Sequence, residues 1–253
     1  MGMRMVHRVV LCLMVAAAVL APASGARTRP PAVAGLEVVY DFYLGGIWAG
    51  ELTVGATFGA ENYSASSELR TTGIVGFFYK LAFEAEVVGG IDAGGLFPVH
   101  YSSNQRDPKR QEFVEISFRD GSPRSTRVEP ARRVRPWSIE ARDQRGATDP
   151  LSAVLAAFTP GPADAVCDQR IVVYDGRHRF ALEIDPPQRE GARIRCDAMY
   201  VRLAGYKPKW MGKRAWRPFT LFLEERADGL FEVVRAVGES SYGPLILLLR
   251  DIE

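Results

Sequence analysis

Histidine and cysteine, on which metal sites and much acid–base catalysis depend, are rare in this sequence. There are three of each among 253 residues, and His7 and Cys12 fall within the first 26. His100 and His178 have no further histidine or cysteine at metal-ligand spacing, and the acidic residues form no calcium-loop pattern. We therefore expect no metal and no cofactor.

Catalytic and phosphate-binding motifs are missing too. No serine lies in a Gly-x-Ser-x-Gly sequence, and no glycine pair precedes the helix that a phosphate cradle requires. One catalytic hypothesis remains, a hydrolase in which His178 or His100 acts as a general base beside a carboxylate. The alternative is that such a histidine is a hydrogen-bonded core residue.

Long apolar runs are absent after residue 26. Before it, Arg4 and Arg8 precede the apolar run 9–20, and small residues follow up to Ala26. This order is typical of a secretory signal peptide, and a core of about a dozen residues is shorter than the roughly 20 that a spanning helix needs. We expect cleavage after Ala26, or alternatively after Ala23, and a periplasmic protein with no transmembrane segment after cleavage.

Net charge is nearly absent as well. The chain has 32 Lys and Arg against 30 Asp and Glu, and Arg4 and Arg8 leave with the signal peptide, so the exported chain is formally neutral. We therefore expect no nucleic-acid partner, because such a chain is exported and carries no overall positive charge. The stretch 119–146 is arginine-rich, but acidic residues are interspersed, which favours a solvated edge of a sheet over a nucleic-acid arm.

Cys167 and Cys196 are the two cysteines left after cleavage. The exported compartment is oxidising, and their spacing is not that of a metal site. The simplest prediction is one disulfide, which closes a loop of about 30 residues. Two free buried thiols are the alternative, and a redox-active Cys-x-x-Cys arrangement is absent.

Alternating apolar residues predict strands over most of the remaining chain. Alternate positions of 36–44 are apolar, Gly45–Gly46 supplies a turn, and 52–58 carries the return strand. Asp-Gly turns between later apolar runs are typical of hairpins. Further strands are expected over 63–71, 82–88, 99–103, 113–118, 171–174, 179–184, 193–203, 219–225, 231–237 and 245–250, with a helical turn within 73–81.

One segment, 148–158, has the pattern of a helix, with a polar cap, Pro150 in the first turn and an Ala- and Leu-rich body. Asp149 and Ser152 resemble a reactive pair, but capping of this helix explains both. We expect a mostly β fold: an antiparallel meander that forms a long curved sheet or open barrel, with one short covering helix. A flexible leader over 27–35 would precede a single all-β domain over 36–253.

The stretch Gly205–Phe219, GYKPKWMGKRAWRPF, combines basic and aromatic side chains. Such a mixture suits anionic headgroups or a glycan, although the aromatics can instead pack on the sheet while the basic groups stay solvated. The candidate binding surface consists of Tyr206, Lys207, Lys209, Trp210, Lys213, Arg214, Trp216 and Arg217.

Several local patterns carry a family resemblance. They are Tyr40–Gly46, Gly95–Pro98 leading into Tyr101, Thr148–Ser152, Tyr174–Arg177, Cys196 through Gly205–Tyr206, and Arg217–Phe219. With these motifs the chain resembles an exported bacterial family known as domain of unknown function three-one-zero-eight. The resemblance implies a periplasmic all-β protein and carries over no catalytic residue.

These observations lead to three functional hypotheses. The first is a non-enzymatic periplasmic protein that binds a cell-envelope component, such as a lipid or other apolar ligand, in the concavity of its sheet. The second is a scaffold that docks another envelope protein through the Lys207–Arg217 region. The third is the hydrolase that uses His178 or His100.

Overall fold

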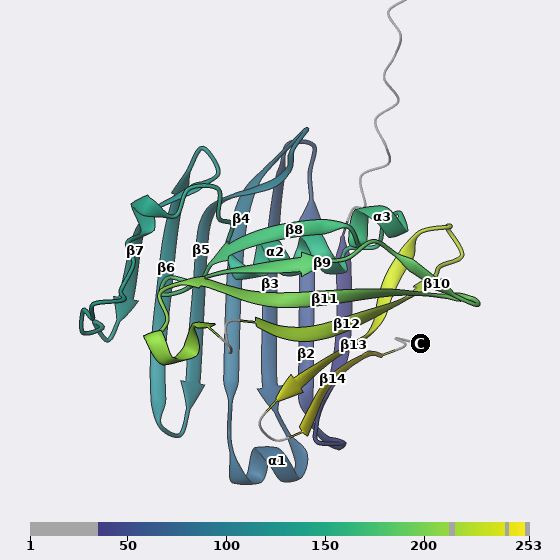
Figure 1. Cartoon of the computed structure of the whole chain (residues 1–253), viewed down its shortest axis with the longest axis horizontal. Helices are drawn as coiled ribbons and strands as arrows, with labels where there is room; N and C mark the ends of the chain where they lie inside the picture. Colours follow the sequence, from purple (N-terminus) through teal and green to yellow (C-terminus); the bar gives the residue numbers. More distant parts are fainter. Residues whose placement is uncertain (1–34, 213–215, 241–242, 251–253) are drawn as a thin grey trace, which may run out of the picture. The chain divides into compact units, whose positions relative to one another are not determined.

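The computed structural model describes residues 35–212, 216–240 and 243–250, and every structural statement below concerns these residues. Fourteen strands form one antiparallel sheet (Figure 1). The sequence predicts an antiparallel sheet with twelve of these strands and misses those at 122–129 and 188–190. The strands are β1 (Leu36–Leu44), β2 (Ile47–Phe58), β3 (Asn62–Thr71), β4 (Ala82–Asp92), β5 (Gly95–Asp107), β6 (Arg110–Arg119), β7 (Ser122–Glu129), β8 (Gln169–Tyr174), β9 (Arg179–Ile184), β10 (Gln188–Glu190), β11 (Arg193–Ala204), β12 (Trp216–Glu225), β13 (Phe231–Ser240) and β14 (Gly243–Leu249). The helices are α1 (Gly73–Phe78), α2 (Pro150–Phe158) and α3 (Ala163–Val166), with short 3₁₀ turns η1 (Ala141–Asp143) and η2 (Pro208–Trp210).

Two meanders make up the sheet. Strands β1 to β7 pair in chain order, as do β11 to β14, and the first and last strands join the two halves where Tyr40 faces Leu249. The two outermost strands of the path are β7 and β8. They approach each other through side chains, since the Thr126 hydroxyl donates to the Tyr174 hydroxyl at 3.1 Å. The sheet is therefore a nearly closed barrel whose last contact is made by side chains.

Helix α2 lies against the inner face of this sheet, where it contacts β3, β4, β5 and β8. Its Leu151 and Leu155 are buried in the same core cluster as Tyr40 and Tyr101. At its start, the Asp149 carboxylate accepts hydrogen bonds from the Leu151 and Ser152 amides at 2.8 and 2.9 Å. The capping explanation is thus confirmed, and the covering helix fills space inside the barrel.

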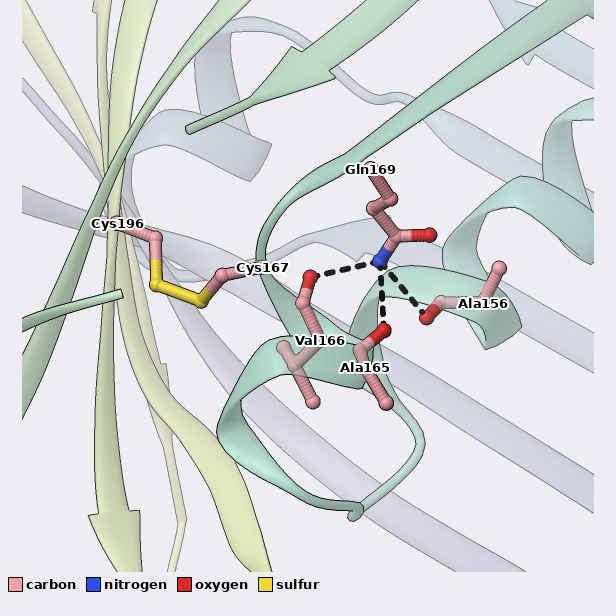
Figure 2. Close-up of a disulfide and its surroundings, with 6 residues drawn as sticks. All are labelled: Ala156, Ala165, Val166, Cys167, Gln169 and Cys196. Carbon is pink, nitrogen blue, oxygen red and sulfur yellow. Dashed lines mark hydrogen bonds between the residues drawn. A yellow bond between two sulfur atoms is a disulfide. The ribbon is translucent and has the colours of Figure 1, made fainter. Parts of the chain in front are cut away.

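A second core cluster lies beside the disulfide. Cys167 and Cys196 are bonded, with their Cα atoms 6.1 Å apart, which confirms the sequence prediction (Figure 2). Both cysteines are fully buried, and Ile184, Leu221 and Leu223 belong to the same cluster. The disulfide therefore anchors the start of β8 to β11 within an apolar environment.

Several predicted boundaries differ from the observed ones. The strand expected over 99–103 extends as β5 from Gly95 to Asp107, because the residues on both sides of the expected strand still pair with β4 or β6. The arginine-rich stretch begins in β7, which pairs with β6 alone and is an edge strand as expected. The expected signal peptide over 1–26 and nearly all of the leader over 27–35 lie outside the described residues.

Candidate functional site

A cavity of about 910 Å³ lies where the two ends of the sheet approach each other. Its walls come from β6, β7, the segment 131–142 that follows β7, and the turn between β8 and β9. Only two acidic side chains, Glu112 and Glu140, line it. The basic residues of the lining, here called the arginine cavity, are Arg110, Arg124, Arg132, Arg133, Arg135, Arg142, Arg177 and Lys207.

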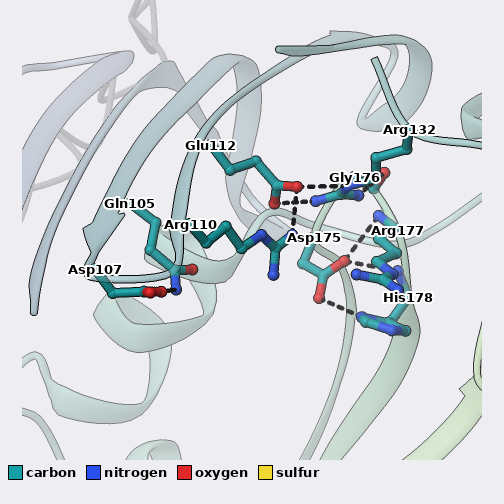
Figure 3. A network of polar contacts seen from close by, with 9 residues as sticks. All are labelled: Gln105, Asp107, Arg110, Glu112, Arg132, Asp175, Gly176, Arg177 and His178. Atoms are coloured by element: carbon teal, nitrogen blue, oxygen red, sulfur yellow. Dashed lines mark hydrogen bonds and ion pairs between the residues drawn. The ribbon is translucent and has the colours of Figure 1, made fainter. Parts of the chain in front are cut away.

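Glu112 organises the inner end of the arginine cavity (Figure 3). Its buried carboxylate accepts a hydrogen bond from Arg132 Nε at 2.8 Å, and both Arg132 and Arg110 form ion pairs with it. Burial acts to raise the pKa of Glu112, but the hydrogen bonds from Arg132 and Arg110 outweigh it and lower the pKa to about 2. The carboxylate therefore stays ionised and fixes two of the arginines.

Arg132 also connects the cavity to the β8–β9 turn. Its Nη1 donates to the carbonyl oxygen of Gly176 at 3.2 Å. The segment that follows β7 is thereby tied to the hairpin at the opposite end of the sheet.

Positive charge remains in the cavity after its ion pairs are counted. Glu140 is held by Arg142 at 2.8 Å. Among the described residues, no acidic side chain forms an ion pair with Arg133, Arg135, Arg177 or Lys207. Burial lowers the pKa of the Arg177 guanidinium, and the charges of Arg132 and Arg110 lower it further. A recess with unbalanced guanidinium groups stabilises an anion that enters it.

The wall of the arginine cavity also has an apolar part. Val128, Val134, Trp137 and Ile139 line it, and Val134 is largely exposed to solvent. Half of the basic residues and three of these four apolar residues lie on the segment 131–142, and all of them line the same cavity. This arrangement suits a ligand that is both anionic and partly apolar.

A smaller cavity of about 360 Å³ adjoins the first and shares Arg110, Glu112, Arg132 and Arg177 with it. Asp175 lies in its wall, where Oδ1 accepts from the amides of Arg177 and His178 at 2.8 and 2.6 Å. Asp175 Oδ2 lies 3.0 Å from His178 Nδ1 (Figure 3). These contacts close the β8–β9 turn with the acid and the imidazole facing each other.

The residues of the predicted binding surface do not form one continuous surface in the structure. Tyr206 is buried, its ring stacks on His178 with centroids 4.2 Å apart, and its hydroxyl bonds to that of Tyr200. Lys207 lines the arginine cavity, and its Nζ lies 5.6 Å from the centre of the Trp210 ring. Burial raises the pKa of Tyr206, as does its hydrogen bond with Tyr200. Tyr206 therefore contributes to packing, while Lys207 faces the cavity.

The rest of that surface is spread along the chain. Lys209 and Trp210 are exposed in η2, and Arg217 is exposed on β12. Trp216 is the first residue of β12, and the backbone of Trp216 pairs with that of Val201 in β11. Lys213 and Arg214 lie outside the described residues.

His100 and His178 occupy different places. His100 is on β5, and its Nε2 lies 3.5 Å from Glu115 Oε1 of β6 on the surface. His178 pairs with Asp175, but the same carboxylate closes a turn, so the pair has a structural explanation. Among the described residues, no group of three or more histidine, cysteine or acidic side chains has the geometry of a metal site.

The principal residues of this site, Arg110, Glu112, Arg132 and Arg177, are not among those that the sequence patterns indicated. The signal for part of it was present in Ala131–Trp137, ARRVRPW, where arginines alternate with apolar residues. Composition alone does not distinguish such a segment from a solvated edge. What makes it a site is its position against β6 and the β8–β9 turn.

Comparisons with known proteins add a family and no relative. A family model described as Protein of unknown function (DUF3108) matches residues 39–203. No curated protein and no solved structure matches the chain. Within the described part of the chain, no helix has the length and apolar character needed to cross a bilayer.

Proposed function

The chain belongs to the DUF3108 family, and because that family has no stated function, we propose one from the geometry of the arginine cavity. The protein is a non-enzymatic periplasmic protein that binds a cell-envelope component. Its ligand is an anionic amphiphile, a lipid whose headgroup carries phosphate.

One observation carries this proposal: eight basic side chains and two neutralised carboxylates line a single cavity that also has an apolar wall. Guanidinium groups bind phosphate oxygens through paired hydrogen bonds, and Arg133 and Arg135 have no acidic partner among the described residues. Val134 and Trp137 supply contacts for the first carbons of an acyl chain. The basic side chains and the apolar wall thus both support an anionic amphiphile as the ligand.

The site proposed here is not the concavity of the sheet. Leu151 and Leu155 of α2 occupy that space together with Tyr40 and Tyr101. A ligand in the arginine cavity leaves this packing intact.

The other two hypotheses receive less support. Docking through Lys207–Arg217 is weakened because Tyr206 is buried and Lys207 faces the cavity. A hydrolase at His178 is weakened because the hydrogen bonds of Asp175 close the β8–β9 turn. We therefore rank both below ligand binding.

Calorimetry with the purified exported protein tests the proposal. The probe is dodecyl phosphate below its micellar concentration, and the variant is Arg133→Gln combined with Arg135→Gln. We expect this double variant to weaken binding at least tenfold. Arg189→Gln is the matched control, since Arg189 is exposed on β10 and does not line the cavity.

Two further probes separate the parts of the ligand. Dodecyl maltoside keeps the chain without the anion, and inorganic phosphate keeps the anion without the chain. We expect both to bind more weakly than dodecyl phosphate. Equal binding of dodecyl maltoside, or no loss in the double variant, would overturn the proposal, while equal binding of inorganic phosphate would assign the cavity to a free phosphate.

A further inference from the structure

A group of large apolar side chains is exposed at the end of the sheet where α1 lies, at the bottom of Figure 1. Phe77 and Phe78 are 79% and 78% exposed, and Ile74 is 63% exposed. Side chains of the β1–β2 hairpin and of the residue after α1 are exposed beside them. We call the whole group the aromatic tip; it consists of Ile47, Trp48, Ile74, Phe77, Phe78 and Tyr79.

Hydrogen bonds of the backbone and of the Thr71 hydroxyl hold the aromatic tip in place. The Thr72 amide donates to the Ala49 carbonyl at 2.9 Å, which joins α1 to β2. The Thr71 hydroxyl donates to the carbonyl of Tyr79 at 2.8 Å and accepts from the amide of Leu81 at 2.8 Å. The connection between β3 and β4 is therefore a fixed structure that presents its apolar side chains outward.

The orientation of α1 is opposite to that of a helix packed on a core. Its buried residue is Gly76, where an added Cβ would lie 2.7 Å from the Thr71 carbonyl oxygen. The small residue thus faces the protein, while Phe77 and Phe78 face solvent. Because a helix normally buries its apolar side chains, this arrangement indicates an external apolar partner.

One basic side chain beside the tip, Lys80, has no acidic partner among the described residues. Asp41 and Glu51 are both ion-paired with Arg250, and Trp48 Nε1 donates to Asp41 at 3.0 Å. These two carboxylates share one guanidinium, and Lys80 is the exposed basic side chain beside the tip.

Strand register places two ion-paired arginines at the same end of the sheet. Arg70 of β3, Ala82 of β4 and Arg106 of β5 lie in one row, and Glu84 pairs with both arginines. The β5–β6 turn follows directly, with Lys109 exposed and Arg110 in the lining of the arginine cavity. One end of the sheet therefore carries both the aromatic tip and part of the cavity wall.

We propose that the aromatic tip inserts into the interfacial layer of a lipid bilayer that contains anionic lipid. Protruding phenylalanines suit the apolar side of that layer, Trp48 and Tyr79 suit its boundary with water, and Lys80 attracts anionic headgroups. A bilayer is favoured over a peptide partner because the side chains project outward with more than half of the surface of Phe77 and Phe78 free. The proposal goes beyond ligand binding, since no residue of the tip lines the arginine cavity.

Flotation with vesicles tests this docking. The exported protein is mixed with vesicles of phosphatidylcholine, with or without phosphatidylglycerol, and the bound fraction is measured. We expect binding to be stronger with phosphatidylglycerol, and we expect Phe77→Ser with Phe78→Ser to weaken it at least tenfold. Val99→Ser is the matched control, an exposed apolar residue near the β4–β5 turn.

Two measurements refine the result. Lys80→Gln should weaken binding to the anionic vesicles and leave binding to phosphatidylcholine unchanged. Brominated lipid should quench the fluorescence of the protein, and Trp48→Phe should remove most of that quenching. Circular dichroism of each variant checks that its fold is intact.

Specific outcomes overturn the proposal. It fails if the wild-type protein does not float, or if the double phenylalanine variant floats as well as the wild type. A wild-type dimer that the double variant converts to a monomer, with unchanged flotation, would instead assign the tip to contact between copies. Binding of dodecyl phosphate should be unchanged in the double phenylalanine variant, which separates this proposal from that for the arginine cavity.

Discussion

The two ends of the β8–β9 hairpin are held by opposite chemistry. At its open end, Cys167 precedes β8 and is bonded to Cys196 of β11 (Figure 2). Ile184 of β9 lies in the same apolar cluster. At its turn end, Gly176 accepts a hydrogen bond from Arg132, and His178 stacks on Tyr206. One end is covalent and apolar, and the other is polar and charged.

This contrast relates the open end to the stability of the fold and the turn end to the binding of an anion. A disulfide within an apolar cluster holds its strands without regard to pH or salt. The turn end depends on Glu112, whose single carboxylate faces Arg110 and Arg132. The remaining cations repel one another, so this end stores unfavourable electrostatic energy that a bound anion would relieve.

Removal of the disulfide should have the largest effect on stability. Cys167 and Cys196 are 29 residues apart, and the loop-entropy argument gives a loss of about 3 kcal/mol in the free energy of unfolding. Urea unfolding of the Cys167→Ser, Cys196→Ser double variant measures it. Reductant should lower the stability of the wild type toward that of the variant and leave the variant unchanged. Equal stability of the oxidised wild type and the variant would contradict the contrast.

Glu112→Gln should be the next largest change. The substitution leaves Arg110 and Arg132 without their shared carboxylate, and we expect a loss of about 2 kcal/mol in the free energy of unfolding at neutral pH. Urea unfolding checks this value. Glu86→Gln is the control, because Glu86 is exposed on β4 and should be nearly neutral.

The effect of Glu112→Gln should also depend on pH. The pKa of Glu112 falls from 4.5 to about 2 on folding, so the folded state binds its proton more weakly than the unfolded state. The stabilisation is complete above the unfolded pKa and is lost as the pH falls through the folded value. The difference between wild type and variant should therefore shrink between pH 4.5 and about 2. A constant difference over this range would show that the carboxylate is not the stabilising group.

Gly205→Ala tests how closely the segment after β11 approaches the turn end. Gly205 has φ of +87°, and an added Cβ would overlap the carbonyl of Arg177. Gly191 also has positive φ, +64°, but an added Cβ meets nothing within 4 Å. Both alanine variants carry the backbone strain of about 1 kcal/mol, and Gly205→Ala should be at least about 1 kcal/mol worse in thermal or urea unfolding. Equal losses would show that the approach is not tight.

The apolar end of the hairpin was predictable from the sequence. Alternating residues predicted β8, β9 and β11, and the expectation of export, with two cysteines remaining after cleavage, predicted the disulfide. The cap of α2 was predictable for the same reason, because Asp149 and Pro150 act on residues beside them in the chain. The strand patterns and the helix cap depend on residues that are neighbours in the sequence, and each of the two cysteines has a single possible partner.

The polar end was not predictable. Arg110, Arg132 and Arg177 meet only because β7 and the β8–β9 turn lie at the two ends of one nearly closed sheet. The pairing of β1 with β14 sets that geometry, and nothing near the arginines in sequence encodes it. The stacking of His178 on Tyr206 has a different origin, the pairing of β9 with β11, in which Arg179 faces Ala204. Charge patterns alone do not identify which arginines share a cavity.

A polar side chain also serves the apolar end, and its removal should have the smallest effect. Gln169 Nε2 donates to the carbonyls of Ala156 and Ala165, each at 3.2 Å, and of Val166 at 2.6 Å, which ties α2 and α3 to β8 (Figure 2). Gln169→Leu should cost about 1 kcal/mol in urea unfolding, since the disulfide still holds the strand. Gln188→Leu, at an exposed position on β10, is the control. A loss from Gln169→Leu as large as that from Glu112→Gln would show that the open end also depends on polar contacts, and the contrast between the two ends would no longer hold.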